Sequence, residues 1–353
     1  MSSGITFVDP LAPRAYGGAP GELAGLGGTE ATLVKIAESL AARLRVTVRQ
    51  AARQGDGLSG RVRYAPLDLD RPLPEAPGMI VVVNSWKVAP KLARLNPGAR
   101  VIVWQHVFPG RHNRGLAPRL KAAGVEVICV SEAHAAWLRA FLGPDAPRIG
   151  YIHNPIADDL APDETPRNPD LLLFASSPHK GLGQVFRRFE VLRAQFPTLR
   201  LAVADPGYLA WPTGPVPDGV IPLGRLDQPR LIGWMRRALC LFYPQDQFAE
   251  TFGLVIAEAN AVGCPALLHR GLGANDEVAS DPGQCIDTTD PAAIAARIGE
   301  WRAAIGQGLL ARAQPGFRMS RIAGQWAARL QPATRPDPEF LTRTDNQRKV
   351  RHD

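Results

Sequence analysis

Short apolar runs alternate with amphipathic stretches along most of the chain, and this alternation strongly constrains the fold. In the first half, five runs predict buried strands, at residues 5–8, 45–49, 79–84, 101–105 and 126–130. Apolar residues at helical spacing separate these runs, for example at 29–43 and 133–141. Strands that alternate with helices at this interval form parallel sheets covered on both faces. The sequence therefore predicts an α/β, doubly wound domain.

A second series of the same kind follows residues 153–170, HNPIADDLAPDETPRNPD, which are rich in Pro and Asp and have no period. Its predicted strands lie at 171–175, 199–204, 219–223, 240–243 and 265–269, with helices at 184–195 and 228–238 between them. At 353 residues the chain exceeds the usual size of one core. We expect two Rossmann-like domains, at 1–160 and 168–330, that face each other across a cleft, and a polar tail at 331–353.

The charge of the chain is concentrated in its first half. Residues 31–150 hold 18 Lys or Arg and 8 Asp or Glu, whereas the net charge of the whole chain is +8. A basic surface suits nucleic acid, an anionic membrane or an anionic substrate, and composition alone leaves these open. Nucleic acid is the weakest of the three, because interleaved aromatic residues and a reading motif are both missing.

The sequence has no pattern typical of a secreted, membrane-spanning or metal-binding protein. The first residues have no basic segment followed by an apolar one, and the chain has no long apolar run, so we expect a cytoplasmic protein without a spanning helix. The four cysteines lie far apart, in neither a zinc spacing nor a disulfide framework. We therefore expect no metal site and no cofactor.

The segment ETFGLVIAEANAVGCPALL, residues 250–268, places two glutamates in a small, apolar context. An unpaired carboxylate on a buried helix face is costly, so each glutamate needs a polar partner. If residues 251–254 form the first helical turn, their free N–H groups can hold a diphosphate. Glu258 would then reach the hydroxyls of a ribose, and Glu250 would stand near a sugar.

Three other segments place polar or glycine residues after predicted strands. Gly27 and Gly28 precede a helix, although the strict dinucleotide-binding glycine spacing is absent. His106 follows the strand at 101–105, and Lys180 precedes a predicted helix. Such positions suit an anionic ligand, but a flexible loop, a structural histidine and an ordinary capped helix explain them equally well.

Together these motifs resemble those of glycosyltransferase family 4, whose members are retaining enzymes with the two-domain GT-B architecture. ETFGLVIAEANAVGCPAL is similar to the E-x7-E signature of that family, and GLGGTE resembles its N-terminal glycine loop. VICVSEAHAAWL, YIHNPI and RGLGANDEVASDPGQCI resemble further segments. The resemblance extends to about residue 330.

The resemblance implies transfer of a sugar from a UDP- or GDP-linked donor to a glycan, lipid-linked or small-molecule acceptor, without metal or cofactor. It implies catalytic roles for Glu250 beside the sugar, Lys180 at the diphosphate and His106 in the first domain. Glu258 would bind the nucleotide ribose. The other donor-binding positions that it implies are Gly27, Gly28, Ser176, Ser177, Thr251, Phe252, Gly253 and Leu254.

One position departs from the family pattern. Ala175 stands where the family usually has an arginine, and Ser176 and Ser177 offer hydroxyls in place of charge. A sugar-nucleotide epimerase or hydrolase, or a non-catalytic nucleotide-sugar binder, would use the same cleft. The basic first half also suits peripheral attachment to an anionic membrane surface.

Overall fold

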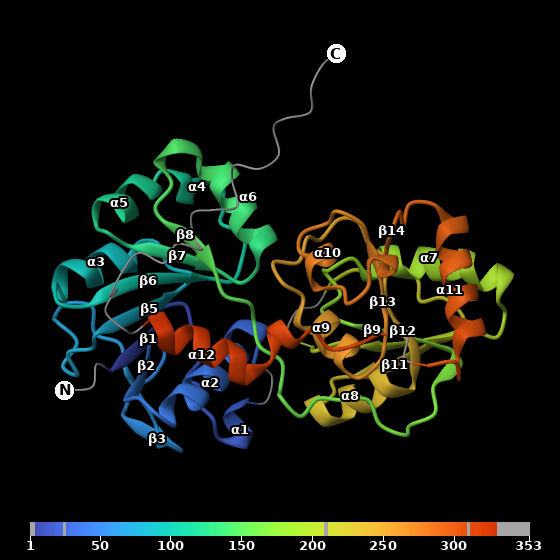
Figure 1. Ribbon diagram of the computed structural model, residues 1–353, viewed down its shortest axis with the longest axis horizontal. Helices are drawn as coiled ribbons and strands as arrows, with labels where there is room; N and C mark the ends of the chain where they lie inside the picture. Colours follow the sequence, from blue (N-terminus) through green and yellow to red (C-terminus); the bar gives the residue numbers. More distant parts are fainter. Residues whose placement is uncertain (1–3, 24–25, 208–210, 309–310, 330–353) are drawn as a thin grey trace, which may run out of the picture.

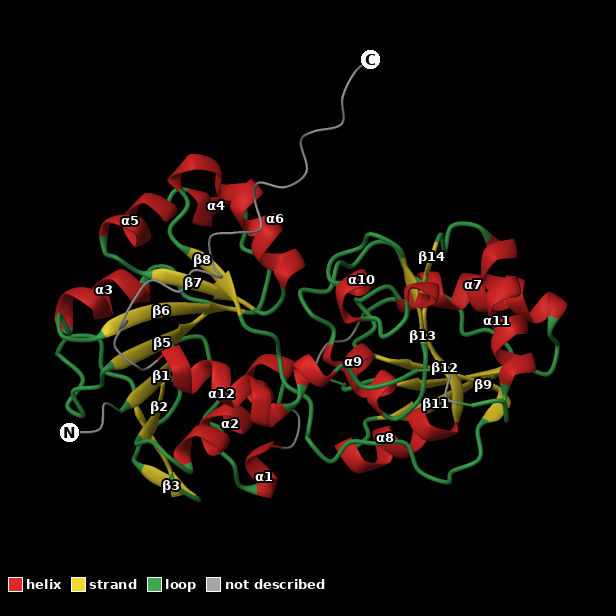
Figure 2. Cartoon of the chain, in the orientation of Figure 1, coloured by secondary structure: helices red, strands yellow, loops and turns green. Residues whose placement is uncertain are grey.

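The structure is a computed structural model that describes residues 4–23, 26–207, 211–308 and 311–329. These residues form two α/β units that lie side by side, with the first half of the chain in one and most of the second half in the other (Figure 1). Helices cover the sheet of each unit (Figure 2). The predicted GT-B arrangement of two doubly wound units is confirmed.

The first unit contains, within its described residues, an eight-stranded sheet of order β3-β4-β2-β1-β5-β6-β7-β8, parallel except for β3. Its strands are β1 (Ile5–Asp9), β2 (Val46–Gln50), β3 (Gly57–Ser59), β4 (Val62–Pro66), β5 (Met79–Val83), β6 (Arg100–Gln105), β7 (Glu126–Cys129) and β8 (Ile149–Tyr151). Its helices are α1 (Pro20–Leu23), α2 (Gly28–Ala41), α3 (Val88–Leu95), α4 (Arg111–Arg114), α5 (Ala117–Ala122) and α6 (Glu132–Leu142). Strands β1, β2 and β5 are buried along their whole length, as expected for parallel strands covered on both faces.

The second unit has a parallel sheet of order β11-β10-β9-β12-β13-β14. Its strands are β9 (Asn168–Ala175), β10 (Arg200–Ala204), β11 (Val220–Gly224), β12 (Ala238–Tyr243), β13 (Ala266–His269) and β14 (Cys285–Ile286). Its helices are α7 (Leu182–Gln195), α8 (Gln228–Arg237), α9 (Leu254–Ala261), α10 (Asn275–Val278) and α11 (Pro291–Ala304). In both sheets the strand order reverses beside the first strand, between β1 and β5 and between β9 and β12. Ligands of such sheets bind at this reversal.

The last described helix, α12 (Met319–Arg329), returns to the first unit, where it packs against α2. The fully buried Trp326 contacts the rings of Phe7 and Trp104, at centroid distances of 6.4 and 5.0 Å. This corrects the expectation that residues up to 330 belong to the second domain: α12 buries its apolar face on the first one. The remaining domain bounds stay predictions, and the predicted tail at 331–353 lies outside the described residues.

Candidate functional site

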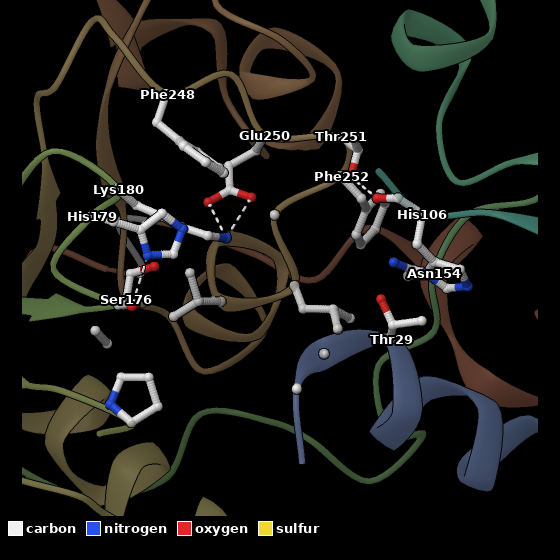
Figure 3. A pocket seen from close by; sticks show the side chains of 18 of the residues that line it. Thr29, His106, Asn154, Ser176, His179, Lys180, Phe248, Glu250, Thr251 and Phe252 are labelled. Atoms are coloured by element: carbon white, nitrogen blue, oxygen red, sulfur yellow. Dashed lines mark hydrogen bonds and ion pairs between the residues drawn. The ribbon is translucent and has the colours of Figure 1, made fainter. Parts of the chain in front are cut away.

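A cavity of about 560 Å³ lies between the two units, at the carboxyl ends of their strands (Figure 3). Its walls come from the start of α2, the loop after β6, the linker before β9, the loops after β9, β10, β11 and β12, helix α8 and the start of α9. The predicted site residues that line it are Gly27, Gly28, His106, Ser176, Ser177, Lys180, Glu250, Thr251, Phe252, Gly253 and Leu254. Of the residues predicted for the site, Glu258 alone does not line this cavity.

Glu250 and Lys180 form an ion pair in the wall of the cavity. The Lys180 Nζ donates to both carboxylate oxygens of Glu250, at 2.9 and 3.0 Å, and the Tyr243 hydroxyl donates to one of them at 3.0 Å. The Lys180 Nζ also lies 4.7 Å from the centroid of the Phe248 ring. The Glu250 side chain is only 8% exposed, so its charge needs these partners. The sequence predicted both residues here but not that they pair with each other.

Helix α9 begins at Leu254, three residues later than the predicted helix start at 251. The N-cap is Gly253, with φ 89°, a left-handed conformation that glycine adopts easily. Thr251 therefore lies outside the helix, where its Oγ1 donates to the carbonyl oxygen of His106 at 2.7 Å. The first helical residues, Leu254 and Val255, line the cavity, so the positive end of α9 faces it.

The amino ends of α2 and α9 meet across the cavity. A side chain added at Gly28 would lie 3.6 Å from the Leu254 Cδ1, so these two backbones are separated by little more than one side chain. Gly27 is the N-cap of α2, and a Cβ there would lie 2.7 Å from a carboxylate oxygen of Glu30. Glycine at position 28 thus leaves space between the two helix ends.

Glu258 lies inside α9 and is 8% exposed. Burial raises the pKa of its carboxyl, whereas the charge of Lys35 and a hydrogen bond with Gln228 act to lower it. Lys35 belongs to α2 of the first unit and Gln228 to the start of α8. The carboxylate is therefore held among three helices, and its predicted contact with a ribose stays a prediction.

The loop after β9 carries hydroxyl and imidazole groups as well as Lys180. The Ser177 Oγ lies 2.8 Å from the His179 Nδ1. Burial, with the nearby charge of Lys180, lowers the pKa of His179. Among the described residues that line the cavity, Lys180 is the only lysine or arginine, so no arginine of the described wall replaces the one missing at Ala175. His179 directly precedes Lys180 and lines the cavity, but it was not among the predicted site residues.

His106 follows β6, and both its backbone N–H and its carbonyl oxygen form hydrogen bonds with side chains. Its N–H donates to the Asn84 side chain at 2.7 Å, and its ring lies 4.3 Å from that of Trp104. Burial, with the nearby His134, lowers the pKa of His106 to about 3, so the imidazole is neutral at neutral pH. Among the residues that the structure describes, the His106 Nε2 has no hydrogen-bond partner, and neither does the buried Oδ1 of Asn154, another residue that lines the cavity. These two atoms are suited to contact a polar ligand.

Contacts between the units extend the site toward α6. Glu277 accepts hydrogen bonds at 2.8 Å from the backbone N–H groups of Glu132 and Ala133, the first residues of α6. One oxygen of the same carboxylate lies 2.6 Å from the His153 Nε2, in the linker. The Ser131 hydroxyl donates to the Thr251 carbonyl at 2.6 Å. The loop that carries Thr251 is thus joined directly to the first unit.

In the part of the chain that the structure describes, no group of three or more His, Cys, Asp or Glu side chains could hold a metal ion. Within the same residues, no helix has the length and apolar character needed to cross a membrane.

The second unit matches a known family. Residues 164–303 match the family model of "Glycosyl transferases group 1". None of the curated protein sequences matches the chain. The second unit, which contains Glu250 and Glu258, is therefore similar to glycosyl transferases of group 1.

Solved structures share the fold over almost the whole chain. The crystal structure of AviGT4, a glycosyltransferase involved in avilamycin A biosynthesis, aligns with TM-score 0.55 and 18% identity, over 93% of this chain and 97% of that one. OtsA in its apo form gives TM-score 0.57 and 12% identity, over 94% and 99%. The β-glucosyltransferase of phage T4 gives 0.54 and 10%, over 93% and 96%. Another match, TarM, is longer: the aligned part covers 55% of it, at TM-score 0.50.

Proposed function

We propose that this chain is a retaining glycosyltransferase of family 4 that moves a sugar from a nucleotide-diphosphate sugar to a glycan, lipid-linked or small-molecule acceptor. One observation carries the proposal: the E-x7-E loop and Lys180 meet at the cavity between two GT-B units. The match of residues 164–303 to group 1 glycosyl transferases supports it. A cavity between two units suits a reaction with two substrates, since each unit can bind one of them.

The donor would bind mainly to the second unit. Its diphosphate would lie between Lys180 and the amino ends of α2 and α9, where a positive side chain and free N–H groups face the cavity. Glu258 would accept hydrogen bonds from the ribose, and Glu250 from the sugar. His106 and Asn154 would contact the sugar through the two atoms that have no partner in the described structure.

Catalysis would consist of placing the substrates and stabilising charge on the leaving group. The bond between the anomeric carbon and the phosphate oxygen breaks, and a bond from the same carbon to the acceptor oxygen forms on the same face. The acceptor proton passes to the leaving phosphate, so no protein nucleophile is required. Lys180 and the helix ends stabilise the negative charge that develops on the diphosphate.

The donor and the metal requirement need direct tests. The phage T4 enzyme, which has the same fold, has been solved with UDP and Mn²⁺. We propose a UDP- or GDP-linked donor and a reaction without metal or cofactor. Thermal unfolding with a panel of nucleotide sugars identifies the donor, because a ligand at about 100 times its Kd stabilises by roughly 2.7 kcal/mol. Transfer assays with EDTA and with added Mn²⁺ then test the metal requirement.

We also propose that the protein acts in the cytoplasm, at times on an anionic membrane surface. The basic side chains of the first unit support this, since each Lys or Arg near such a surface contributes on the order of 1 kcal/mol. Sedimentation with anionic and neutral vesicles, at low and at high salt, tests the attachment. If the protein is recovered equally in the supernatant with anionic and with neutral vesicles at low salt, the membrane attachment is wrong and a soluble acceptor remains.

The transfer assay separates a glycosyltransferase from an epimerase or a hydrolase, which modify the donor without an acceptor.

A further inference from the structure

A row of aromatic rings leads from the cavity onto the surface of the first unit. Phe108, in the loop after β6, lines the cavity, and its ring centroid lies 4.6 Å from that of Trp137 on α6. Trp137 stacks on Phe141, one turn further along α6, at 4.9 Å and with an interplanar angle of 10°. The guanidinium carbon of Arg114 lies 5.6 Å from the centroid of the Phe141 ring. We call Phe108, Trp137 and Phe141 the aromatic row.

The aromatic row lies at the margin of the core of the first unit: Phe108 and Phe141 are half-buried, and Phe141 packs against the core. Trp137 is 40% exposed, and Val107 beside Phe108 is 49% exposed. The side chains that anchor α6 to the sheet are Ala135, Leu138 and Leu142, all fully or almost fully buried. Exposed large aromatic side chains next to a ligand cavity are typical of binding surfaces, where they give contact area at a small cost in conformational entropy.

Helices α4 and α5 carry exposed basic side chains, Arg111 and Arg114 on α4 and Arg119 and Lys121 on α5. Arg114 stands directly at the end of the row. A ligand that lies along the row with an acidic group would therefore meet a guanidinium group, which binds carboxylates and sulfates well.

We propose that the aromatic row is an acceptor subsite for an acidic sugar chain. The apolar C–H faces of sugar rings would stack on Trp137 and its neighbours, and an acidic group would pair with Arg114. The proposal rests on the proposed function, in which the acceptor approaches along the first unit. It narrows the acceptor to an anionic glycan whose reacting end enters the cavity past Phe108.

The surroundings of Trp137 favour a glycan over a membrane. A helix that inserts into a membrane presents a broad stripe of large apolar side chains. The exposed residues of α6 around Trp137 are instead short or charged: Glu132, Ala136, Arg139 and Ala140. A narrow row of rings that continues into the cavity fits an extended chain of sugar rings better than a lipid surface.

Calorimetry with two trisaccharides tests the subsite. The probes are trigalacturonic acid, which is acidic, and maltotriose, which is neutral. We expect trigalacturonic acid to bind with a Kd below about 10 mM. Trp137→Ala should weaken this binding roughly tenfold, the equivalent of about 1.4 kcal/mol, and Trp137→Phe much less. Arg114→Ala should weaken the binding of trigalacturonic acid and leave the binding of maltotriose unchanged. Leu58→Ala and Arg94→Ala, at exposed sites elsewhere on the first unit, are the controls and should change nothing.

The same samples separate this proposal from the proposed function. Nucleotide-sugar stabilisation should be equal in wild type and in Trp137→Ala, which also shows that the variant is folded. Absence of trisaccharide binding, or equal binding by Trp137→Ala, overturns the subsite even where donor binding is intact. If neither trisaccharide binds to the wild type, and Trp137→Ala loses binding to anionic vesicles, the aromatic row contacts a membrane surface and the subsite proposal is wrong.

Discussion

The ammonium group of Lys180 lies within 3.0 Å of both carboxylate oxygens of Glu250. The two residues belong to the loops after β9 and β12, the strands between which the order of the second sheet reverses. The fold itself therefore brings them together. A diphosphate that enters the cavity would compete with Glu250 for Lys180, and the pair keeps the lysine at the cavity wall until then.

Removal of the Lys180 charge should slow transfer strongly. We expect Lys180→Ala to reduce turnover by about 10²–10³, the usual effect of losing one group that stabilises transition-state charge, and Lys180→Arg to reduce it less. Ala175→Arg should partly restore the alanine variant, because it returns a positive charge to the carboxyl end of β9, next to the loop that carries Lys180. The measurement is the initial rate at saturating donor. Lys91→Ala, which breaks an exposed ion pair with Asp70, is the control. Wild-type turnover in Lys180→Ala would show that the phosphate lies elsewhere.

Glu258 gives a separate test of donor binding. We expect Glu258→Gln to weaken nucleotide-sugar binding by about 1.5–3 kcal/mol, because a neutral amide accepts the ribose hydroxyls less strongly than a carboxylate does. Calorimetry with the donor identified by thermal unfolding measures this loss. Glu190→Gln, on the exposed face of α7, serves as the matched control. An unchanged donor affinity would remove Glu258 from the site.

The sequence predicted the elements of this fold better than it predicted the contacts between them. Observed strands coincide with the predicted apolar runs, because parallel strands that are buried on both faces consist mainly of apolar residues. The return of α12 to the first unit depends on the burial of Trp326 against Phe7 and Trp104, residues more than 200 positions away. No local pattern contains that information.

The candidate site shows the same limit. The predicted site residues other than Glu258 line one cavity, because the carboxyl ends of parallel strands meet at one edge. The pairing of Lys180 with Glu250 and the contact of Thr251 with His106 were not predicted. Both depend on how loops from separate parts of the chain lie against each other, which spacing along the sequence does not determine.

Gly253 should be required for the start of α9. Its φ is 89°, and an added Cβ would lie 2.8 Å from the Ile256 Cδ1, so we expect Gly253→Ala to lower the free energy of unfolding by about 1–3 kcal/mol. Gly233→Ala is the matched control. Gly233 lies inside α8, and its nearest neighbour to an added Cβ is 4.0 Å away, so alanine there should stabilise by about 0.5–1 kcal/mol. Urea denaturation measures both, and equal effects would contradict the strain at Gly253.

Glu277 should make the contact between the two units sensitive to acid. Its carboxylate accepts two backbone hydrogen bonds from the start of α6 and lies 2.6 Å from the His153 Nε2. Replacement by glutamine removes the charge that these donors face. At pH 7 we expect Glu277→Gln to reduce the free energy of unfolding by about 1–3 kcal/mol, whereas Glu300→Gln, at an exposed pair on α11, should change it little.

The pH dependence of that difference follows from the pKa of Glu277. The hydrogen bonds from His153 and α6 outweigh the effect of burial and hold this pKa below its usual value of 4.5. A carboxyl with a lowered pKa in the folded state stabilises fully above the unfolded value, and this stabilisation disappears as the pH falls through the folded value. The gap between wild type and Glu277→Gln should therefore shrink as the pH falls below 4.5. Urea denaturation at pH 7, 5 and 3.5 tests this, and a gap of equal size at all three would show that the charge of Glu277 does not stabilise the contact.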